Sequence, residues 1–356
     1  MCSSDLTPLA LRSHAIWRDI EAEAGVKLLT PCGGLIISNE RRRAISHGVE
    51  NFFSNTVEAA RRHAIAHEIL DAPAIRRRFP RFRVADHEVG YYEPEAGFLA
   101  VEDCVRTQLA LAEKGCAHIQ TGRAVTSLTA SPGGVRATLA DGDVVEAEYA
   151  LVTAGGWTPE LLGGAFPDLL SVTRQVLHWF EVDAEARADF EPGAFPVYIW
   201  ELPRGEQGIY GFPIAGAIAD GVKIATEQRR VATTPDCVDR NVTPQETDGM
   251  FSAYVAPFFS GLRAKSLKTA TCFYTDAPGG RFVIDRAPGM PRTLFASACS
   301  GHGFKHSAAL GEALAERLAT GRSTIDLSPF SLSALRAQDA LMDGRQRAAL
   351  AALLRA

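Results

Sequence analysis

Hydrophobic positions along the chain follow two rhythms, one of about 3.6 residues and one of two, so both helices and strands are expected. In residues 8–24 the apolar side chains of Leu9, Ile16 and Ile20 fall on one side of a helix that ends at Gly25. The spacing predicts further helices over residues 50–66, over 102–114 with Gly115 as the cap, and after residue 305, with Leu310, Leu314 and Leu318 on one face.

Strands are predicted between these helices. Val135–Leu139 and Val145–Tyr149 alternate apolar and polar residues around Asp141-Gly142, which is typical of a β-hairpin. Tyr149–Thr153 is almost wholly apolar and predicts a strand at the centre of a parallel sheet, followed by the turn Ala154-Gly155-Gly156-Trp157. Other extended segments are predicted at residues 34–38, 91–99, 172–181, 197–201, 208–212 and 221–226.

Composition indicates a soluble globular enzyme. With 356 residues, 46% of them hydrophobic and 22% charged, the chain can bury a large core in two domains. The net charge of -5 gives no sign of a nucleic-acid partner, and no apolar run reaches the ~20 residues of a membrane span. The arginine-rich segment 76–83 is interpreted as a solvated face rather than a phosphate site.

The seven cysteines show neither C-x-x-C pairs nor metal-ligand spacing, so no metal site is expected. Reduced thiols, and hence a cytoplasmic location, are the default interpretation. On the local sequence alone, Cys272 fits a small buried hydrophobe, and Cys299 is assigned to packing.

The segment Ser300-Gly301-His302-Gly303-Phe304-Lys305 is the most informative part of the chain. It follows the apolar run 294–298 and leads into the predicted helix after residue 305, so it is a glycine-rich turn between a strand and a helix. Glycines let a backbone approach a flat ligand closely, and the N–H groups and dipole of a helix N-terminus stabilise negative charge. The segment therefore predicts a ligand-binding corner.

A series of short segments, in order along the chain, matches one known family. The segments are Pro8–Ser13, Ala154–Trp157, Arg174–Val176, Gly208–Pro213, Val222–Ile224, Lys268–Thr275, Phe282–Asp285 and Ser300–Lys305. Together they resemble monomeric sarcosine oxidase and N-methyltryptophan oxidase, a family of FAD-dependent amine oxidases. The resemblance covers nearly the whole chain, and a reduced flavin carries the negative charge that the glycine turn suits.

The resemblance implies an α/β (α+β) fold of two discontinuous domains, that of FAD-dependent oxidoreductases of the D-amino acid oxidase type. A substrate domain with an antiparallel sheet would comprise residues 31–86 and 171–267. The FAD-binding domain would comprise residues 87–170 and 268–325, preceded by a helix within residues 7–30 and followed by a C-terminal tail, residues 326–356.

One part of the family pattern has no counterpart. Family members open with a strand, a G-x-G-x-x-G turn and a helix, and no such motif occurs in this sequence. Residues 1–6 match a translation of GTG-TGC-TCT-TCC-GAT-CT, a sequencing-adapter sequence. We therefore expect an artefactual tail in place of a missing first βαβ unit. A natural variant with its own start codon and a split gene are the alternatives.

The resemblance implies that FAD is bound, and bound covalently through Cys272, because the matching cysteine of relatives is joined to the flavin 8α carbon. Such a bond needs a thiolate near an electron-poor ring. The other residues implied to contact the cofactor are Val125, Ala154, Gly155, Trp157, Ser300, Gly301, His302, Gly303, Phe304 and Lys305.

Five residues receive catalytic roles from the resemblance. Lys305 matches a lysine that holds the substrate carboxylate. Lys223 lies in an apolar strand, where its charge is costly unless solvated or paired, and matches a lysine that promotes reaction with oxygen. Tyr210 and Tyr274 match tyrosines that line the substrate site, although each alone fits a core tyrosine. Glu227 departs from the family histidine, and would pair with Lys223 or accept a cationic amine.

The implied activity is oxidation of a secondary amino acid such as sarcosine or N-methyl-L-tryptophan. Hydride would pass to flavin N5, O2 would reoxidise the flavin and give H2O2, and the imine would hydrolyse to amine and formaldehyde. We expect a monomer that acts on a small secondary amino acid and O2, with no nucleic acid and no membrane, and that is inactive as this chain alone. The alternatives are a glycine, D-amino acid or pipecolate oxidase of the same superfamily, and a noncatalytic subunit completed by a partner chain.

Overall fold

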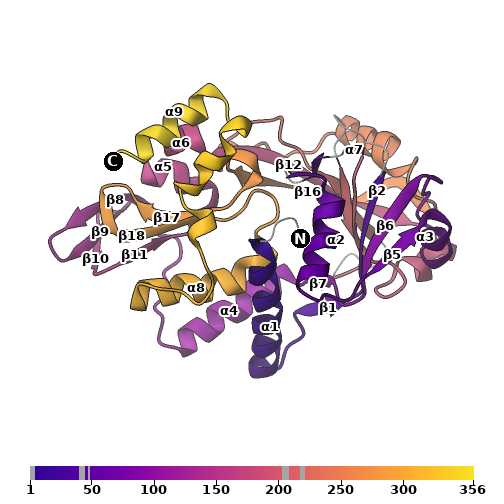
Figure 1. Cartoon of the computed structure of the whole chain (residues 1–356), viewed down its shortest axis with the longest axis horizontal. Coiled ribbons are helices and arrows are strands. Elements are labelled where there is room, and N and C mark those ends of the chain that lie inside the picture. The colour runs from indigo at the N-terminus through magenta and orange to yellow at the C-terminus, as the bar shows by residue number, and fades with distance from the viewer. Residues whose placement is uncertain (1–4, 40–44, 47–48, 203–207, 217–220) are drawn as a thin grey trace.

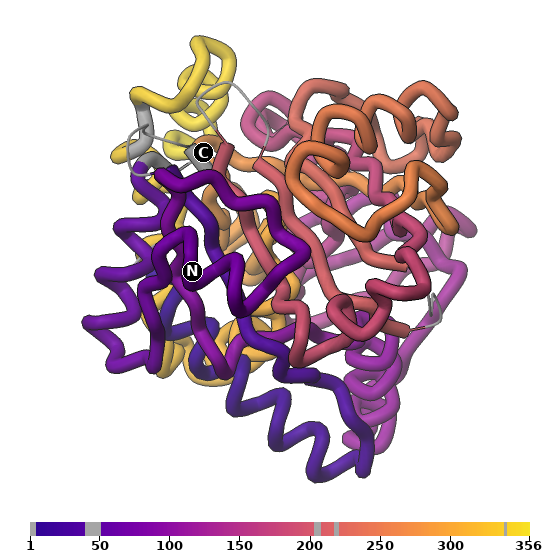
Figure 2. Tube along the Cα trace, turned by 90° about the vertical axis from the view of Figure 1, so that its right-hand side faces the viewer, coloured from indigo at the N-terminus to yellow at the C-terminus, as the bar shows by residue number. Residues whose placement is uncertain are grey.

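The computed structural model describes residues 5–39, 45–46, 49–202, 208–216 and 221–356. The chain forms two lobes that lie side by side, one around a large sheet and the other around a small sheet with helices on both faces (Figure 1). Both lobes draw on distant parts of the sequence, so each is discontinuous (Figure 2). This mixed α/β, two-lobed architecture is the one that the sequence predicts.

The large sheet has eight strands in the order β16-β12-β15-β14-β13-β2-β6-β5. Neighbouring strands are antiparallel except β13 and β2, which are parallel. The strands are β2 (Gly34–Asn39), β5 (Glu68–Asp71), β6 (Glu88–Glu93), β12 (Ser171–Val182), β13 (Val197–Trp200), β14 (Ile209–Phe212), β15 (Gly221–Thr226) and β16 (Leu262–Asp276). The strands predicted at 34–38, 172–181, 197–201, 208–212 and 221–226 are confirmed.

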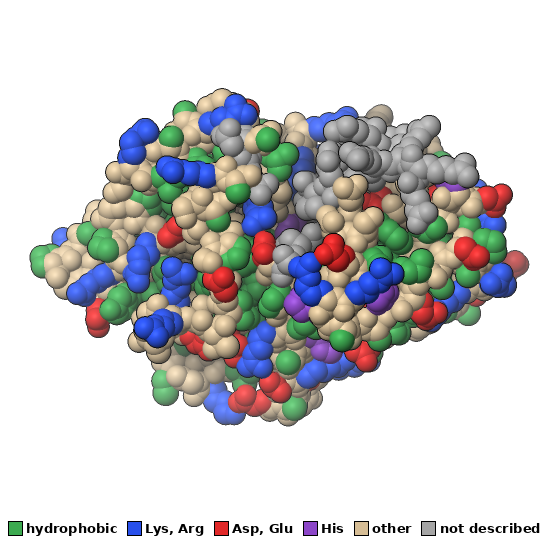
Figure 3. All heavy atoms as spheres, viewed as in Figure 1, with side chains coloured by type: hydrophobic (Ala, Val, Ile, Leu, Met, Phe, Trp, Pro, Cys, Tyr) green, Lys and Arg blue, Asp and Glu red, His purple; other side chains and the backbone are tan. Residues whose placement is uncertain are grey.

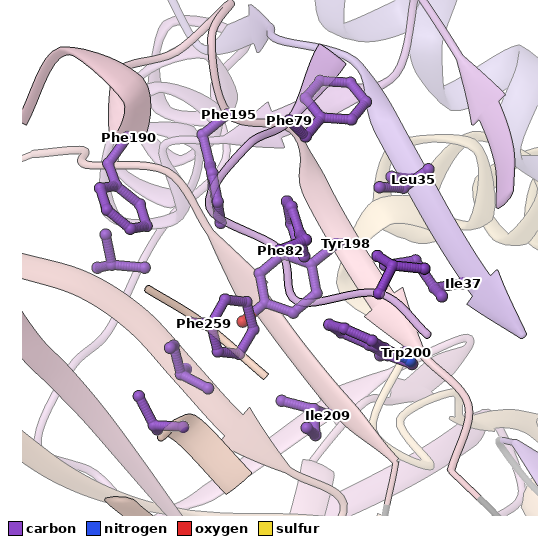
Figure 4. Packing of buried hydrophobic residues seen from close by; sticks show 14 of the residues in the cluster. Leu35, Ile37, Phe79, Phe82, Phe190, Phe195, Tyr198, Trp200, Ile209 and Phe259 are labelled. Carbon is purple, nitrogen blue, oxygen red and sulfur yellow. The ribbon is translucent and has the colours of Figure 1, made fainter. Parts of the chain in front are cut away.

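An aromatic core covers one face of this sheet. Phe82 stacks on Phe195 with ring centroids 4.7 Å apart and meets Tyr198 edge-on at 5.1 Å (Figure 4). Trp200 and Phe259 pack around the same ring, and all five side chains are buried. Helices α3 (Ala72–Arg78) and α7 (Pro244–Met250) and the π-helix η3 (Phe251–Val255) border this core. Burying this much aromatic surface makes the sheet a rigid support for whatever its other face carries.

The other face of the sheet is covered only in part by a helix. At one end α2 (Phe52–Arg62) packs Phe52 and Ala60 against Ile36 of β2 and Tyr91 of β6. The strands β14, β15, β12 and β16 lie at the opposite end of the sheet order. The candidate site residues occupy that end.

The second lobe is built on the sheet β11-β18-β17, from β11 (Ala150–Val152), β18 (Met290–Ser297) and β17 (Val283–Ala287). Helices α1 (Leu6–Ala24) and α8 (Ser307–Thr320) cover one face, and α6 (Phe166–Leu169) and α9 (Gly344–Leu353) the other. The lobe also contains α4 (Val101–Lys114), α5 (Thr158–Leu162), and a meander of β8 (Val125–Ser131), β9 (Gly134–Leu139) and β10 (Val144–Ala147). Two further strand pairs are β1 (Leu29–Pro31) with β7 (Gly97–Leu99), and β3 (Ile45–Ser46) with β4 (Val49–Glu50).

Several local predictions are confirmed. The first helix ends at Gly25, whose φ of 67° is left-handed and suits glycine. Helices occupy the segments predicted at 50–66 and 102–114, and β9 and β10 form the predicted hairpin. Charged side chains of both signs are interspersed on the face shown in Figure 3. Among the described residues no helix is both long and apolar enough to cross a bilayer.

Gly115 caps α4, as predicted, but with an ordinary φ of −80°, and it is Cys116 that takes the left-handed conformation, at 68°. The reason is that the Ala117 N–H closes the helix end on Ala112 O, which makes Cys116 the turning residue. One prediction is wrong in part: β11 pairs in parallel with β18, as predicted, but it lies at the edge of its described sheet, with β18 in the centre. A run of apolar residues indicates burial but not which strands are its neighbours.

The predicted domain division stays a prediction, and two of its boundaries differ from the large sheet. Strand β6 and the second half of β16 pair within that sheet, although the division at residues 87 and 268 places them in the FAD-binding domain. The strand pairs that set these limits connect residues far apart in sequence, so the spacing of residues along the chain does not reveal the limits.

The segment expected to be an artefactual tail includes Leu6. In the structure Leu6 belongs to α1 and is buried.

Candidate functional site

Lys223, Tyr210, Cys272 and Tyr274 lie on one face of the large sheet. Lys223 is the direct cross-strand partner of both Phe212 and Trp179, and Trp179 is also paired with Lys268. Directly paired residues share a face, and so do residues two apart on one strand. Tyr210 is two residues from Phe212 on β14 and therefore shares its face. Cys272 and Tyr274 are four and six residues from Lys268 on β16 and share the face of Lys268. The aromatic core packs on the opposite face.

The Lys223 ammonium lies between two aromatic rings. Its Nζ is 4.8 Å from the centroid of Phe212 and 5.5 Å from that of Trp179. Burial lowers the pKa of Lys223, while nearby Cys272 and Glu102 oppose that shift. Ring faces attract a cation most where water is excluded. Trp179 therefore helps to hold a charge that an apolar strand would otherwise destabilise, and Lys268 lies over the same ring at 5.0 Å.

Cys272 is half-buried on β16, directly before the two residues that glycine turns contact. Burial raises the pKa of its thiol, and the positive charge of Lys223 opposes this shift. A Cβ on Gly156 would lie 2.6 Å from the ring of Phe273, and a Cβ on Gly301 2.7 Å from the ring of Tyr274. Only glycine permits these approaches, so both turns pack closely against β16 directly after Cys272. Phe273 and Tyr274 point to opposite faces of the strand, so the Gly301 turn lies on the face of Cys272 and the Gly156 turn on the other face.

The second turn contains a strained residue. Ser300 is completely buried and has a φ of 42°, a conformation that non-glycine residues seldom adopt. Its N–H donates to Thr275 O at 3.0 Å, and its Oγ donates to Arg281 O at 2.9 Å and accepts from the Ala277 N–H at 3.2 Å. These bonds hold the turn in place at the end of β16.

The remaining residues expected at the cofactor lie in the two turns, except Val125. Trp157 packs edge-on against Phe273 with centroids 5.8 Å apart and donates its indole N–H to Asp236 at 3.1 Å. Gly155 is exposed with a φ of 55°, and His302 contacts Gly280 O through Nε2 at 3.0 Å. Ala154 and Phe304 are half-buried, Gly303 is closed in by the backbone of Ala298, and Val125 is exposed on β8.

Lys305 lies in the short 3-10 helix η5 (Phe304–His306) directly ahead of α8, and its side chain is exposed. Its place at a helix start agrees with the sequence prediction. The structure gives no contact that brings it to Lys223 or the tyrosines, so its role toward a substrate stays a prediction.

Tyr210 and Tyr274 form a hydrogen-bonded pair with hydroxyl oxygens 3.0 Å apart. Burial raises the pKa of both, and the nearby charge of Glu227 adds to the shift. The expected Glu227–Lys223 pair is wrong, because none of the ion pairs among the described residues joins them. Glu227 lies 3.8 Å from Arg229 instead. Lys223 is four residues away along an extended strand, roughly 13 Å, too far for a direct pair.

Sequence reasoning missed four side chains that surround these residues: Trp179, Arg229, Asp276 and Thr173. A signal was present, since Thr173, Gln175, Leu177 and Trp179 alternate along one strand, and Asp276 is two residues from Tyr274. Extending each predicted strand by its period of two would have placed Thr173, Trp179 and Asp276 on the same face, but not Arg229, which lies in the loop after β15.

These residues fit the flavin part of FAD. A thiol on the same face as the Gly301 turn and the N-terminus of a 14-residue helix directly after that turn offer an anion-stabilising surface. The G-x-G-x-x-G turn that binds a dinucleotide pyrophosphate is not in the 356 residues. Among the described residues, no group of three or more His, Cys, Asp and Glu side chains is placed to hold a metal ion.

Comparisons with known proteins agree with this fit. The family model described as FAD dependent oxidoreductase matches residues 3–317. Monomeric sarcosine oxidase from Streptomyces avermitilis is 32% identical over 94% of this chain and 84% of its own length. N-methyl-L-tryptophan oxidase from Escherichia coli O157:H7 is 32% identical over 92% of this chain and 83% of its own length. The open form of NikD, an unusual amino acid oxidase, superposes with a TM-score of 0.74 at 19% identity, covering 92% of this chain and 83% of that one.

The chain therefore belongs to the family of FAD-dependent oxidoreductases. The predicted resemblance to monomeric sarcosine oxidase and N-methyltryptophan oxidase is confirmed, and so is the fold class.

Gly301 should be irreplaceable in this turn. We expect Gly301→Ala to lower the free energy of unfolding by about 2 kcal/mol or more, because φ is +80° and the new methyl group meets Tyr274. Gly311→Ala is the control, since Gly311 lies in α8 with open space around it and should gain up to about 1 kcal/mol. Urea unfolding measures both; equal changes would show that the turn tolerates a side chain.

Proposed function

We propose that the protein, with its cofactor, oxidises a secondary amino acid at the carbon–nitrogen bond. The observation that supports this most is the sheet face on which Cys272, Lys223 and the Tyr210–Tyr274 pair lie together beside the Gly301 turn. The names of the relatives, sarcosine oxidase and N-methyl-L-tryptophan oxidase, support the substrate class. Bound FAD supplies the two-electron chemistry that no amino-acid side chain provides.

Each side chain has a role in this proposal. Lys305 would bind the substrate carboxylate and orient the amine. The tyrosine pair would line the substrate site, with hydroxyls that stay protonated because burial raises their pKa. The Lys223 ammonium, fixed between two rings, would stabilise negative charge that develops during reaction with oxygen. Cys272 would hold the cofactor covalently.

The carboxylate of Glu227 argues against sarcosine as the preferred substrate. Sarcosine has no side chain to meet a carboxylate, whereas Glu227 lies close enough to Tyr210 and Tyr274 to influence both hydroxyls. We therefore propose a substrate with a hydrogen-bond donor or a cation in its side chain.

The six described cysteines form no disulfide bonds. We further propose a monomeric, cytoplasmic enzyme.

One observation favours a second candidate function, that of a subunit that a partner chain completes. The apolar residues Val101, Val105 and Leu109 form an exposed stripe at i, i+4 and i+8 on α4, and Leu151 on the edge strand β11 is 38% exposed. An edge strand and an apolar stripe left in water favour association. We propose that a strand-and-helix unit supplied from outside these residues completes this lobe.

The 356-residue chain alone is expected to lose FAD on desalting and to show no amine oxidase activity. The reason is that its sequence lacks the glycine turn that binds the pyrophosphate. The measurement is the flavin spectrum after desalting of protein incubated with FAD, with peroxide output on sarcosine as the second readout. Stoichiometric flavin together with peroxide would contradict the expectation.

In protein that carries the nucleotide-binding unit, Cys272 is expected to retain the flavin after acid precipitation. Cys272→Ala should release all of it to the supernatant, because the thiol is the proposed attachment point. Cys299→Ala is the control: its Sγ accepts the Thr275 N–H at 3.4 Å, which is a packing role. Flavin that leaves the wild-type protein on acid treatment would refute covalent attachment while leaving amine oxidation to be judged by peroxide output.

A further inference from the structure

Arg229 lies at the centre of a polar network beside the tyrosine pair. Its guanidinium is 3.1 Å from the Asp276 carboxylate and 3.8 Å from the Glu227 carboxylate. It also donates a hydrogen bond to Ser300 O at 3.1 Å. One side chain thus joins the end of β16, the loop after β15 and the strained glycine turn.

Gln175 fixes the loop that carries Arg229. Its side-chain oxygen accepts the Gln228 N–H at 2.9 Å, and its side-chain nitrogen donates to Gln228 O. Both peptide groups of Gln228 are therefore paired as they would be in a strand ladder. Gln228 stands between Glu227 and Arg229, so the fully buried Gln175 sets the backbone from which both charged side chains project.

Asp276 is also held by a hydrogen bond from strand β12. The Thr173 hydroxyl donates to it at 2.7 Å, and Gln175 donates to Thr173 at 3.1 Å. Burial raises the pKa of Asp276, and the charge of Arg229 opposes that shift. A continuous chain of polar contacts runs from Gln175 through Thr173, Asp276 and Arg229 to Glu227.

The formal charges of these three described side chains do not sum to zero. One guanidinium faces two carboxylates, 3.1 Å and 3.8 Å away, so the three groups together carry a charge of about −1 when both acids are ionised. Asp276 lies within hydrogen-bonding distance of the guanidinium, whereas Glu227 at 3.8 Å is attracted to it by charge, so Arg229 neutralises Glu227 less fully than it does Asp276.

We propose that Arg229 is a positioning residue that holds Glu227 at the Tyr210–Tyr274 end of the site, and that this end receives a positively charged side-chain group of the substrate. The substrate part rests on the proposed amine oxidation. The positioning part concerns only the described residues and is independent of it.

A double-mutant cycle in the 356-residue chain without ligand tests the positioning. Glu227→Gln should lower the urea midpoint in the wild-type background, because it removes a partner of Arg229. In the Arg229→Gln background the same change should raise the midpoint, because it relieves repulsion with the unpaired Asp276. Arg229→Lys should restore part of the loss. Additive effects would overturn the proposal.

Two isosteric probes test the charge of the ligand: N-methyl-L-ornithine, which ends in an ammonium, and N-methyl-L-norleucine, which ends in a methyl group. In the presence of FAD, wild-type protein should bind the ornithine derivative about tenfold more tightly by calorimetry. The preference should vanish in Glu227→Gln and Arg229→Gln and persist in Arg229→Lys. Arg263→Gln, which removes an exposed ion pair with Asp183, is the control and should leave it unchanged.

Equal binding of the two probes by wild-type protein, or a preference that survives Arg229→Gln, would overturn the inference. If neither probe binds and sarcosine is not oxidised by protein that retains FAD, the proposed function fails instead. The unfolding cycle then still decides whether Arg229 positions Glu227.

Discussion

Lys223→Met is expected to slow the reaction of the substrate-reduced, FAD-loaded protein with oxygen by orders of magnitude, while substrate oxidation changes much less. The Lys223 side chain is half-buried and its ammonium lies between Phe212 and Trp179, so its position is fixed before charge develops. A fixed charge in a site that excludes water is worth several kcal/mol, and about 1.4 kcal/mol is a factor of ten in rate. Stopped-flow mixing, first with substrate under anaerobic conditions and then with oxygen, measures the two steps separately.

Two other lysines provide the comparison for Lys223. Lys268→Met removes a second cation from the same Trp179 ring, but Lys268 is exposed and should change the oxygen step only slightly. Lys305→Ala should weaken substrate binding and substrate oxidation and spare the oxygen step, because Lys305 stands at a helix start suited to a carboxylate. Equal losses in both steps for Lys223→Met and Lys305→Ala would mean that their roles are wrongly assigned.

The sequence predicted which residues would lie together better than it predicted which side chains pair with them. Lys223, Tyr210, Cys272 and Tyr274 were assigned from their segments, and cross-strand register brings them to one face. The partner of Glu227 was not predictable in the same way. Its pairing with Arg229 depends on a loop whose backbone is set by Gln175, a residue 53 positions away from Gln228.

The fold shows the same limit. Periodicity located the strands of the large sheet, because burial on one or both faces leaves a pattern in the sequence. It did not reveal that β13 runs parallel to β2 or that β11 lies at an edge. Those features depend on which strands meet, and the residues that meet are more than a hundred positions apart.

The stability of the chain is expected to fall as the pH drops from 7 to 5, largely through His306. This side chain is completely buried next to Phe282, and neither ring nitrogen has a hydrogen-bond partner among the described residues. Burial is the main cause that lowers the pKa of His306 from 6.5 to about 2, with Lys305 and His302 as smaller causes. The folded protein thus keeps His306 neutral directly beside Lys305, which avoids a second positive charge there.

The sign of the effect follows from proton binding. Below pH 6.5 the unfolded chain protonates His306 and the folded chain does not, so the unfolded state binds more protons and acid favours it. Each pH unit below 6.5 removes about 1.4 kcal/mol, which amounts to about 2 kcal/mol between pH 7 and pH 5. The stabilisation is fully present above pH 7 and decreases steadily down to the folded pKa.

His306→Leu should remove this dependence, whatever it does to stability at pH 7. Urea unfolding at pH 7, 6 and 5 should show a shallower pH slope for His306→Leu by about one proton. His178 is also buried, and burial lowers its pKa, so part of the slope should remain in the variant. His14→Leu, at an exposed position on α1, is the matched control and should keep the wild-type slope. An unchanged slope in His306→Leu would show that His306 is protonated or solvated in the folded chain, contrary to its burial at the start of α8.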